Sequence, residues 1–141
     1  LMNRTELPLQ LIDSSQARNL LITADFAVLA SGTAALEAAL VATPMVVSYK
    51  VSWVTYLFAR LTARVKHVSM PNHLMDEPLV PELLQGEANL ENLLKTVTPY
   101  LENADLRKEQ SRALSRIAPT LRRDSGKLAA LAIQDLLNSE Q

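Results

Sequence analysis

The sequence of 141 residues contains no cysteine, three glycines and only 4% aromatic residues. The absence of cysteine excludes disulfide bonds and cysteine-ligated metal centres, and it is typical of a cytoplasmic protein. The two histidines, His67 and His73, lack the carboxylate spacing of a zinc motif, so we expect no metal. No apolar run reaches the roughly 18 residues that a membrane-spanning helix needs, and no signal peptide is evident.

The sequence also lacks an excess of charge of either sign. The formal net charge is −1, with 21% charged and 48% hydrophobic residues. This balance gives no indication of a general nucleic-acid binder. A chain of this length and composition is expected to form one soluble domain with a real hydrophobic core. The first residues, Leu1-Met2-Asn3, do not resemble a native start, so we expect a piece of a longer protein.

The most informative stretch is Ala30 to Glu37, which reads ASGTAALE. A short apolar run precedes it and an Ala- and Leu-rich segment follows, so we expect a tight strand-to-helix turn at Ser31-Gly32. With Thr33 as N-cap, free N–H groups at the helix start would attract an anion such as phosphate. Glu37 lies one turn further on and could accept hydrogen bonds from ribose hydroxyls. The alternative is an ordinary turn in which Gly32 only permits close packing.

The first half of the chain alternates between short apolar segments and helical patterns. We expect strands at residues 7–12, 26–30 and 45–49, and helices at residues 15–24 and 33–42. Such alternation predicts right-handed crossovers and a parallel sheet, which is an α/β, Rossmann-like fold. Ligands of these sheets bind at the carboxyl ends of the strands. We expect Ser31-Gly32, Asp13 to Ser15 and Tyr49-Lys50 at that edge.

The second half of the chain becomes helical after about residue 80. We predict helices at residues 89–101, at 103–121 with a break near Pro119, and from residue 124 or 125 to 137. Before them we expect a helix at 52–64, a short strand at 65–70, a loop to Pro78 and a one-turn helix at 81–85. The apolar 52–64 helix is either buried between layers or in contact with a lipid surface. The carboxyl-terminal helices also contain a group of basic residues, which form either a solvated face or a contact for phosphate or anionic lipid. They are Arg112, Arg116, Arg122 and Arg123.

Several motifs in one order resemble the lipid-A-disaccharide synthase family. They are residues 30–40 (ASGTAALEAAL), 43–49 (TPMVVSY), 56–61 (YLFARL), 68–72 (VSMPN) and 80–85 (VPELLQ). The resemblance covers the chain from about Leu9 to its end. It implies the carboxyl-terminal domain of a GT-B type glycosyltransferase, with a Rossmann-like domain at residues 1–101. Helices at residues 102–141 would then pack on it or on a partner domain.

The resemblance implies an inverting enzyme without a required metal or cofactor. It joins UDP-2,3-diacylglucosamine to 2,3-diacylglucosamine 1-phosphate (lipid X), giving the lipid A disaccharide and UDP. It acts at the cytoplasmic face of the Gram-negative inner membrane. The carboxyl-terminal domain holds UDP, and we expect the catalytic residues in the amino-terminal domain, which this sequence lacks. We therefore expect this chain to be inactive alone.

The resemblance also assigns roles to individual residues. Ser31, Gly32 and Thr33 would hold the diphosphate, and Glu37 the ribose. Asn72 would lie near the diphosphate or the sugar. Gln85 and Glu82 would support the loop above the nucleotide. Tyr49 and Lys50 would border the site.

The sequence departs from the family after Pro71-Asn72. The family has an apolar pair and a small Ala-Gly turn there, whereas this chain has residues 73–77 (HLMDE). Asp76 or Glu77 near a diphosphate would be unfavourable unless it points away. His73 is a general acid/base by residue type only.

Two other classes of function stay open. One is another UDP-sugar enzyme of this fold, such as a 2-epimerase. The other is a non-catalytic binding or dimerisation module whose carboxyl-terminal helices form a homodimer, since their apolar faces would be exposed without a partner domain.

Overall fold

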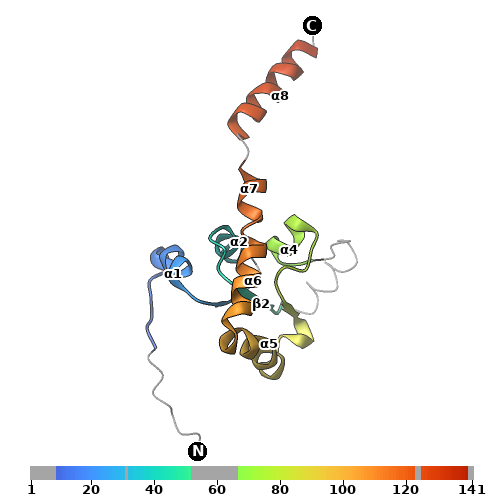
Figure 1. Ribbon diagram of the computed structural model, residues 1–141. Helices are drawn as coiled ribbons and strands as arrows, with labels where there is room; N and C mark the ends of the chain where they lie inside the picture. The colour runs from blue at the N-terminus through green and yellow to red at the C-terminus, as the bar shows by residue number, and fades with distance from the viewer. Residues whose placement is uncertain (1–8, 31, 52–66, 123–124, 140–141) are drawn as a thin grey trace, which may run out of the picture.

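A three-stranded parallel sheet forms the centre of the computed structural model, which describes residues 9–30, 32–51, 67–122 and 125–139. The strands lie in the order β1 (Ala27–Leu29), β2 (Met45–Tyr49) and β3 (Glu82–Leu84). Val28 of β1 pairs with Val46 of β2, and Ser48 pairs with Leu83 of β3. Helices flank this sheet, so the predicted α/β, Rossmann-like class is confirmed (Figure 1).

The helices follow the predicted alternation closely in the first half of the chain. A 3-10 turn, η1 (Ser14–Gln16), leads into α1 (Ala17–Thr23), and α2 (Thr33–Leu40) follows β1. Later helices are α4 (Met70–Met75), α5 (Leu90–Glu102), α6 (Ala104–Leu114), α7 (Ile117–Leu121) and α8 (Ser125–Ser139), with a 3-10 turn η2 (Gln85–Glu87) after β3.

The core lies between the sheet and the helices α2, α6 and α7. Ala35, Ala38 and Ala39 of α2 are fully buried, because small side chains let this helix lie close to the sheet. The same cluster includes further buried residues, namely Leu21, Met45, Val47, Val80, Leu114 and Ile117.

One side chain ties α6 to the start of β2. The Gln110 side-chain amide accepts a hydrogen bond from the Met45 N–H (2.9 Å) and donates to the Met45 carbonyl (3.0 Å). It also donates to the Leu79 carbonyl (3.1 Å). Pairing of β2 with the β3 segment begins only at Val47, whose N–H donates to the Pro81 carbonyl. Gln110 therefore satisfies backbone groups where the two segments have not yet joined.

The carboxyl-terminal helices were predicted well except for one break. Asn89 caps α5 as predicted, its side chain accepting from the Asn92 N–H (2.9 Å). The predicted 103–121 helix is divided between α6 and α7 at Ser115-Arg116, and not near Pro119. Pro119 is the third residue of α7, where proline is tolerated because the N–H groups of a first turn have no partner within the helix.

The division of the chain at residue 101 stays a prediction. Beyond that point, α6 packs on the sheet through Gln110 and Leu114, and Ile117 of α7 belongs to the same buried cluster, beside α2 and α4. In Figure 1, α6 and α7 follow one another across the sheet, and α8 projects beyond them.

Two predicted strands are wrong in the described residues. Residues 9–12 of the predicted 7–12 strand form no strand, and Leu9 and Leu11 are 90% and 102% exposed. An apolar segment becomes a strand only when a neighbouring strand takes its backbone hydrogen bonds, and none of the described strands does so. In the predicted 65–70 strand, residues 67–69 are irregular and Met70 begins α4.

Proline positions explain two further corrections. Pro71 lies in the first turn of α4, so the predicted loop from Pro71 to Pro78 contains a helix. Pro81 does not begin the predicted one-turn helix, because Glu82–Leu84 pairs with β2 as β3. Sheet pairing here overrides the local preference of the sequence. The predicted 52–64 helix lies outside the described residues.

Candidate functional site

The turn between β1 and α2 has a backbone that only glycine adopts readily. Gly32 has φ +146° and ψ −159°, and it is the N-cap of α2. Thr33 is the first helical residue, so its prediction as N-cap is wrong, and no side chain in the described part of the chain caps this helix. A Cβ at Gly32 would have no atom within 4 Å. Gly32, Thr33 and Ala34 are exposed, so the first turn of α2 is open to solvent. Ser31 lies outside the described residues.

Thr33 and Glu37 share the solvent-facing side of α2. They are one helical turn apart, and both are exposed, whereas Ala35, Ala38 and Ala39 face the core. This placement agrees with the predicted geometry, in which a phosphate at the helix start and a ribose at Glu37 would lie side by side.

The carboxyl ends of the other strands lie at the same edge of the sheet, because all three strands are parallel. Exposed Tyr49 ends β2 and exposed Lys50 follows it. Gln85 follows β3 and has φ +51°, a left-handed conformation that is uncommon outside glycine. The structure thus brings Gly32 and Tyr49-Lys50 to one edge, as predicted from the sequence. Gln85 joins them through β3, a strand that was not predicted, whereas Asp13 to Ser15, also predicted here, follow no described strand.

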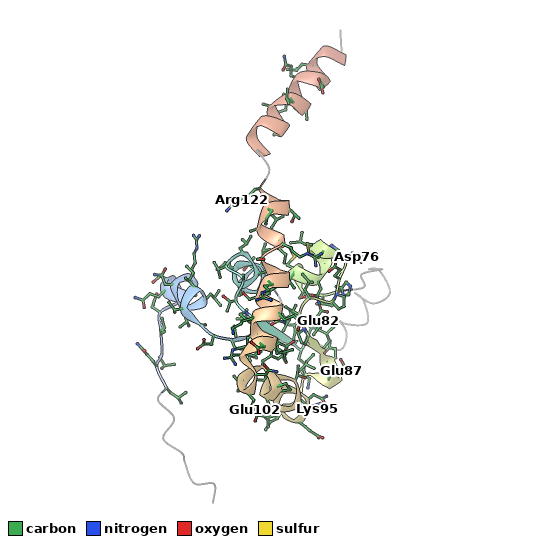
Figure 2. All side chains as sticks on the ribbon, viewed as in Figure 1. Asp76, Glu82, Glu87, Lys95, Glu102 and Arg122 are labelled. Atoms are coloured by element: carbon green, nitrogen blue, oxygen red, sulfur yellow. The ribbon has the colours of Figure 1, made fainter. Side chains whose placement is uncertain are left out.

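Asn72 and Glu82 belong to a separate, largely internal network. Asn72 is 1% exposed, and its Nδ2 donates to the Val80 carbonyl and to Glu82 Oε1, both at 2.8 Å. Its Oδ1 accepts from the Val80 N–H at 2.8 Å. Glu82 lies below α4 in Figure 2. These bonds join α4 to β3. Both polar side-chain atoms of Asn72, Nδ2 and Oδ1, are therefore hydrogen-bonded within the protein.

Glu82 also binds the segment that enters α4. Its carboxylate accepts hydrogen bonds from the Val68 N–H (3.0 Å), the Ser69 N–H (2.9 Å) and the Ser69 hydroxyl (2.6 Å). Partial burial disfavours the charged form of Glu82, but hydrogen bonds from Ser69, Val68 and Asn72 outweigh it and lower the pKa below the ordinary 4.5. Glu82 is therefore an ionised anchor for the α4 entry.

This anchor predicts an acid-dependent loss of stability. Because its pKa is lowered on folding, Glu82 contributes stability that is present above pH 4.5 and lost as the pH falls through its folded-state value. We expect Glu82→Gln to lower the free energy of unfolding at pH 7 by about 2 kcal/mol, with a gap that narrows toward pH 3. Urea unfolding at several pH values measures this. The control Glu87→Gln changes an exposed side chain, and a gap of equal size there would contradict the assignment.

Comparison with known proteins identifies the family. A model of the family described as lipid-A-disaccharide synthetase matches residues 2–136. The chain belongs to the lipid-A-disaccharide synthetase family. The resemblance drawn from the motifs is thereby confirmed.

Three proteins named lipid-A-disaccharide synthase are among its relatives. The one from Psychromonas ingrahamii is 40% identical over 136 residues, which is 96% of this chain and 35% of the relative. The one from Histophilus somni is 40% identical over 129 residues, 89% of this chain and 33% of the relative. The one from Haemophilus ducreyi is 42% identical over 135 residues, 93% and 34% of the two chains. The chain thus spans about a third of the length of the curated relatives it matches.

The acidic residues that depart from the family pattern are held by the protein itself. Glu77 forms a two-pronged ion pair with Arg116, at 2.8 and 3.1 Å. The hydrogen bond from Arg116 holds the pKa of Glu77 below its usual value. Asp76 ends α4 in a left-handed conformation, with φ +50°. The Glu77 carboxylate therefore points to Arg116. Since Arg116 is paired in this way, it does not belong to an unpaired basic face. His73 is exposed on α4.

Sequence reasoning did not single out Ser69 or Gln110. Ser69 carried a signal, because it is the serine of the Ser-x-Pro-Asn motif. Gln110 had no such sequence signal, since a glutamine in a polar helix is usually exposed.

Among the described residues, no three His, Cys, Asp or Glu side chains form a group that could hold a metal ion. None of the helices described is long and apolar enough to span a bilayer.

Proposed function

We propose that this chain is the nucleotide-sugar-binding part of an inverting glycosyltransferase. The whole enzyme would join UDP-2,3-diacylglucosamine to 2,3-diacylglucosamine 1-phosphate, giving the lipid A disaccharide and UDP at the cytoplasmic face of the inner membrane. The observation that carries the proposal is the open, uncapped start of α2 at the carboxyl edge of the sheet, in a chain of this family. Catalytic residues and the acceptor site would belong to the rest of the enzyme.

The β1–α2 turn would bind the diphosphate. Gly32 and Thr33, with Ser31, would present backbone N–H groups and hydroxyls at the positive end of α2. When the glycosidic bond to UDP breaks, negative charge develops on the leaving diphosphate. A fixed helix terminus stabilises that charge without a metal or another cofactor.

Other residues would complete the nucleotide site. Glu37 would accept hydrogen bonds from the ribose hydroxyls, while Tyr49, Lys50 and Gln85 would border the ligand at the ends of β2 and β3. Asn72 and Glu82 would act as positioning residues, because their polar atoms already bind Ser69 and Val80. They would hold α4 in place beside the site.

The role of Glu37 can be tested by UDP binding. We expect Glu37→Ala to weaken UDP affinity about tenfold, because a hydrogen bond to a charged group is lost from the complex. Amide shifts in NMR titrations with UDP and ADP would measure affinity and locate the ligand. Glu91→Ala is a matched control, since it removes the same charge from an exposed position at the start of α5. Equal affinity for UDP in the native chain and Glu37→Ala would remove the ribose assignment.

The same titration tests the function itself. Shifts at residues 32–37 with UDP, and not with ADP, would support a UDP-sugar enzyme. No binding of either nucleotide at millimolar concentration would contradict a preformed site and favour a non-catalytic module. A related UDP-sugar enzyme, such as a 2-epimerase, would share the UDP shifts. Formation of the disaccharide and UDP from UDP-2,3-diacylglucosamine and lipid X by the whole enzyme would distinguish the synthase from such a relative.

Self-association through the carboxyl-terminal helices is a further proposal. Leu131, Ile133 and Leu137 of α8 are exposed, and α8 projects from the rest of the described chain (Figure 1). Such apolar surface favours a partner, either a domain of the same enzyme or a second copy. We expect light scattering of the purified chain to show a dimer that Leu131→Asp and Leu137→Asp together dissociate. A monomer at high micromolar concentration would contradict the homodimer.

A further inference from the structure

A groove of about 560 Å³ lies between α6 and the two turns that lead into β1 and β2. One wall contains Ala24-Asp25 and residues 41–44, which come just before these strands. The groove is therefore at the amino edge of the parallel sheet. Gly32, Lys50 and Gln85 lie at the opposite, carboxyl edge. The groove is thus separate from the proposed nucleotide site.

The two walls of the groove differ in charge. The α6 wall contains Arg107, Lys108, Ser111 and Arg112, at the spacing of one helical face. Among the described residues, the opposite wall has one charged side chain, Asp25. Three cationic groups therefore face a single carboxylate across the groove.

The opposite wall has few hydrogen-bond donors to offer. The Ala42 and Thr43 N–H groups already donate to the Ala39 and Ala38 carbonyls, at 3.0 and 2.9 Å. The Thr43 hydroxyl donates to the Leu21 carbonyl at 2.6 Å. Donors for a ligand in the groove must therefore come mainly from α6.

The α6 cations are only partly engaged within the protein. Arg107 donates from Nη1 to the carbonyls of Tyr100 and Leu101, which fixes its guanidinium and leaves its other N–H groups for a ligand. Lys108 forms an exposed ion pair with Asp105 at 3.2 Å, which is weak in water. In the described part of the chain, the Arg112 guanidinium has no ion-pair partner, unlike that of Arg116, which binds Glu77.

We propose that this groove binds a phosphate-bearing anion. Guanidinium groups bind phosphate oxygens in pairs of parallel hydrogen bonds, and two arginines, a lysine and a serine hydroxyl line one wall. The volume falls within the range of about 300–1,000 Å³ that is usual for small-molecule sites. The phosphate belongs either to a lipid headgroup or to a soluble ester. The site is independent of the proposed nucleotide site.

Titration of the purified chain with inorganic pyrophosphate tests the proposal. We expect saturable amide shifts at Asp25, Ala42-Thr43 and residues 104–112. Arg112→Gln should weaken this binding about tenfold, because it removes a charge-assisted contact. Asp25→Asn should tighten it about threefold, because it removes repulsion of the anion.

Arg122→Gln is the matched control, because it removes the same charge from an exposed residue outside the groove, beyond α7 toward α8 (Figure 2). It should leave the groove affinity unchanged. The proposal would be overturned if Arg112→Gln and Arg122→Gln weakened pyrophosphate binding equally. It would also be overturned if the groove residues showed no saturable shifts with pyrophosphate up to about 20 mM. Pyrophosphate shifts at residues 32–37 would report the nucleotide site separately, so either site can fail alone.

A vesicle experiment separates the two sources of phosphate. Phosphatidylglycerol vesicles would bind the native chain and Arg122→Gln, and bind Arg112→Gln less, if the groove holds a lipid headgroup. If pyrophosphate shifts the groove residues but the chain does not bind vesicles, the ligand of the groove is a soluble phosphate ester.

Discussion

Gln110→Ala is expected to lower the free energy of unfolding by about 3 kcal/mol, because it leaves buried backbone groups without partners. Gln110 is only 6% exposed, and its amide makes three hydrogen bonds to Met45 and Leu79. These bonds hold α6 against the start of β2. Urea unfolding followed by circular dichroism measures the loss.

Two further variants separate hydrogen bonding from packing at this position. Gln110→Leu keeps most of the side-chain volume but removes the polar atoms, so we expect a loss close to that of Gln110→Ala. Glu109→Ala, at the neighbouring exposed position of α6, should change stability by less than about 0.5 kcal/mol. If Gln110→Leu were as stable as the native chain, the hydrogen bonds to Met45 and Leu79 would not be what holds α6.

Gly32→Ala is expected to destabilise the chain by about 1–3 kcal/mol, through backbone strain alone. Gly32 has φ +146°, which an alanine adopts only at a cost, and the new methyl group would contact no atom within 4 Å. If the turn relaxes instead, α2 loses its first turn, and with it the proposed diphosphate site. Thermal unfolding and UDP titration of the same variant distinguish the two results.

Gly86→Ala is the matched control for Gly32→Ala. Its Cβ would also enter open space, but the φ of Gly86 is not in the left-handed region. We expect a change of less than about 1 kcal/mol, of either sign. Equal losses in both variants would show that the conformation of Gly32 is not what makes glycine necessary in the β1–α2 turn.

Local patterns in the sequence were sufficient for much of the fold and for the edge that carries the site. Apolar runs, small residues and cap residues predicted β1, α2, β2 and α5 correctly, because these elements follow the local preference of their residues. Parallel strands then fixed which residues share the carboxyl edge. Gly32 and Tyr49 could be brought together on that ground alone, whereas Gln85 reaches this edge only because residues 82–84 pair with β2. Their ligand stays a proposal.

Tertiary contacts decided the places where local preference gave the wrong answer. Residues 82–84 became a strand because β2 offered hydrogen-bond partners, and residues 9–12 did not because no described strand did. Asn72 was expected near the diphosphate or the sugar, and Glu82 in support of the loop above the nucleotide. The fold instead binds their polar atoms to one another, to Ser69 and to Val80.

The sequence by itself determined the family, the fold class and the strand–turn–helix around Gly32. Those properties depend on residue order and on conformations within a few residues. Only the tertiary structure decided the partners of Gln110, the pairing of Glu77 with Arg116 and the groove along α6. These contacts join residues 65 and 39 positions apart in the first two cases, and such long-range contacts exist only after the chain has packed.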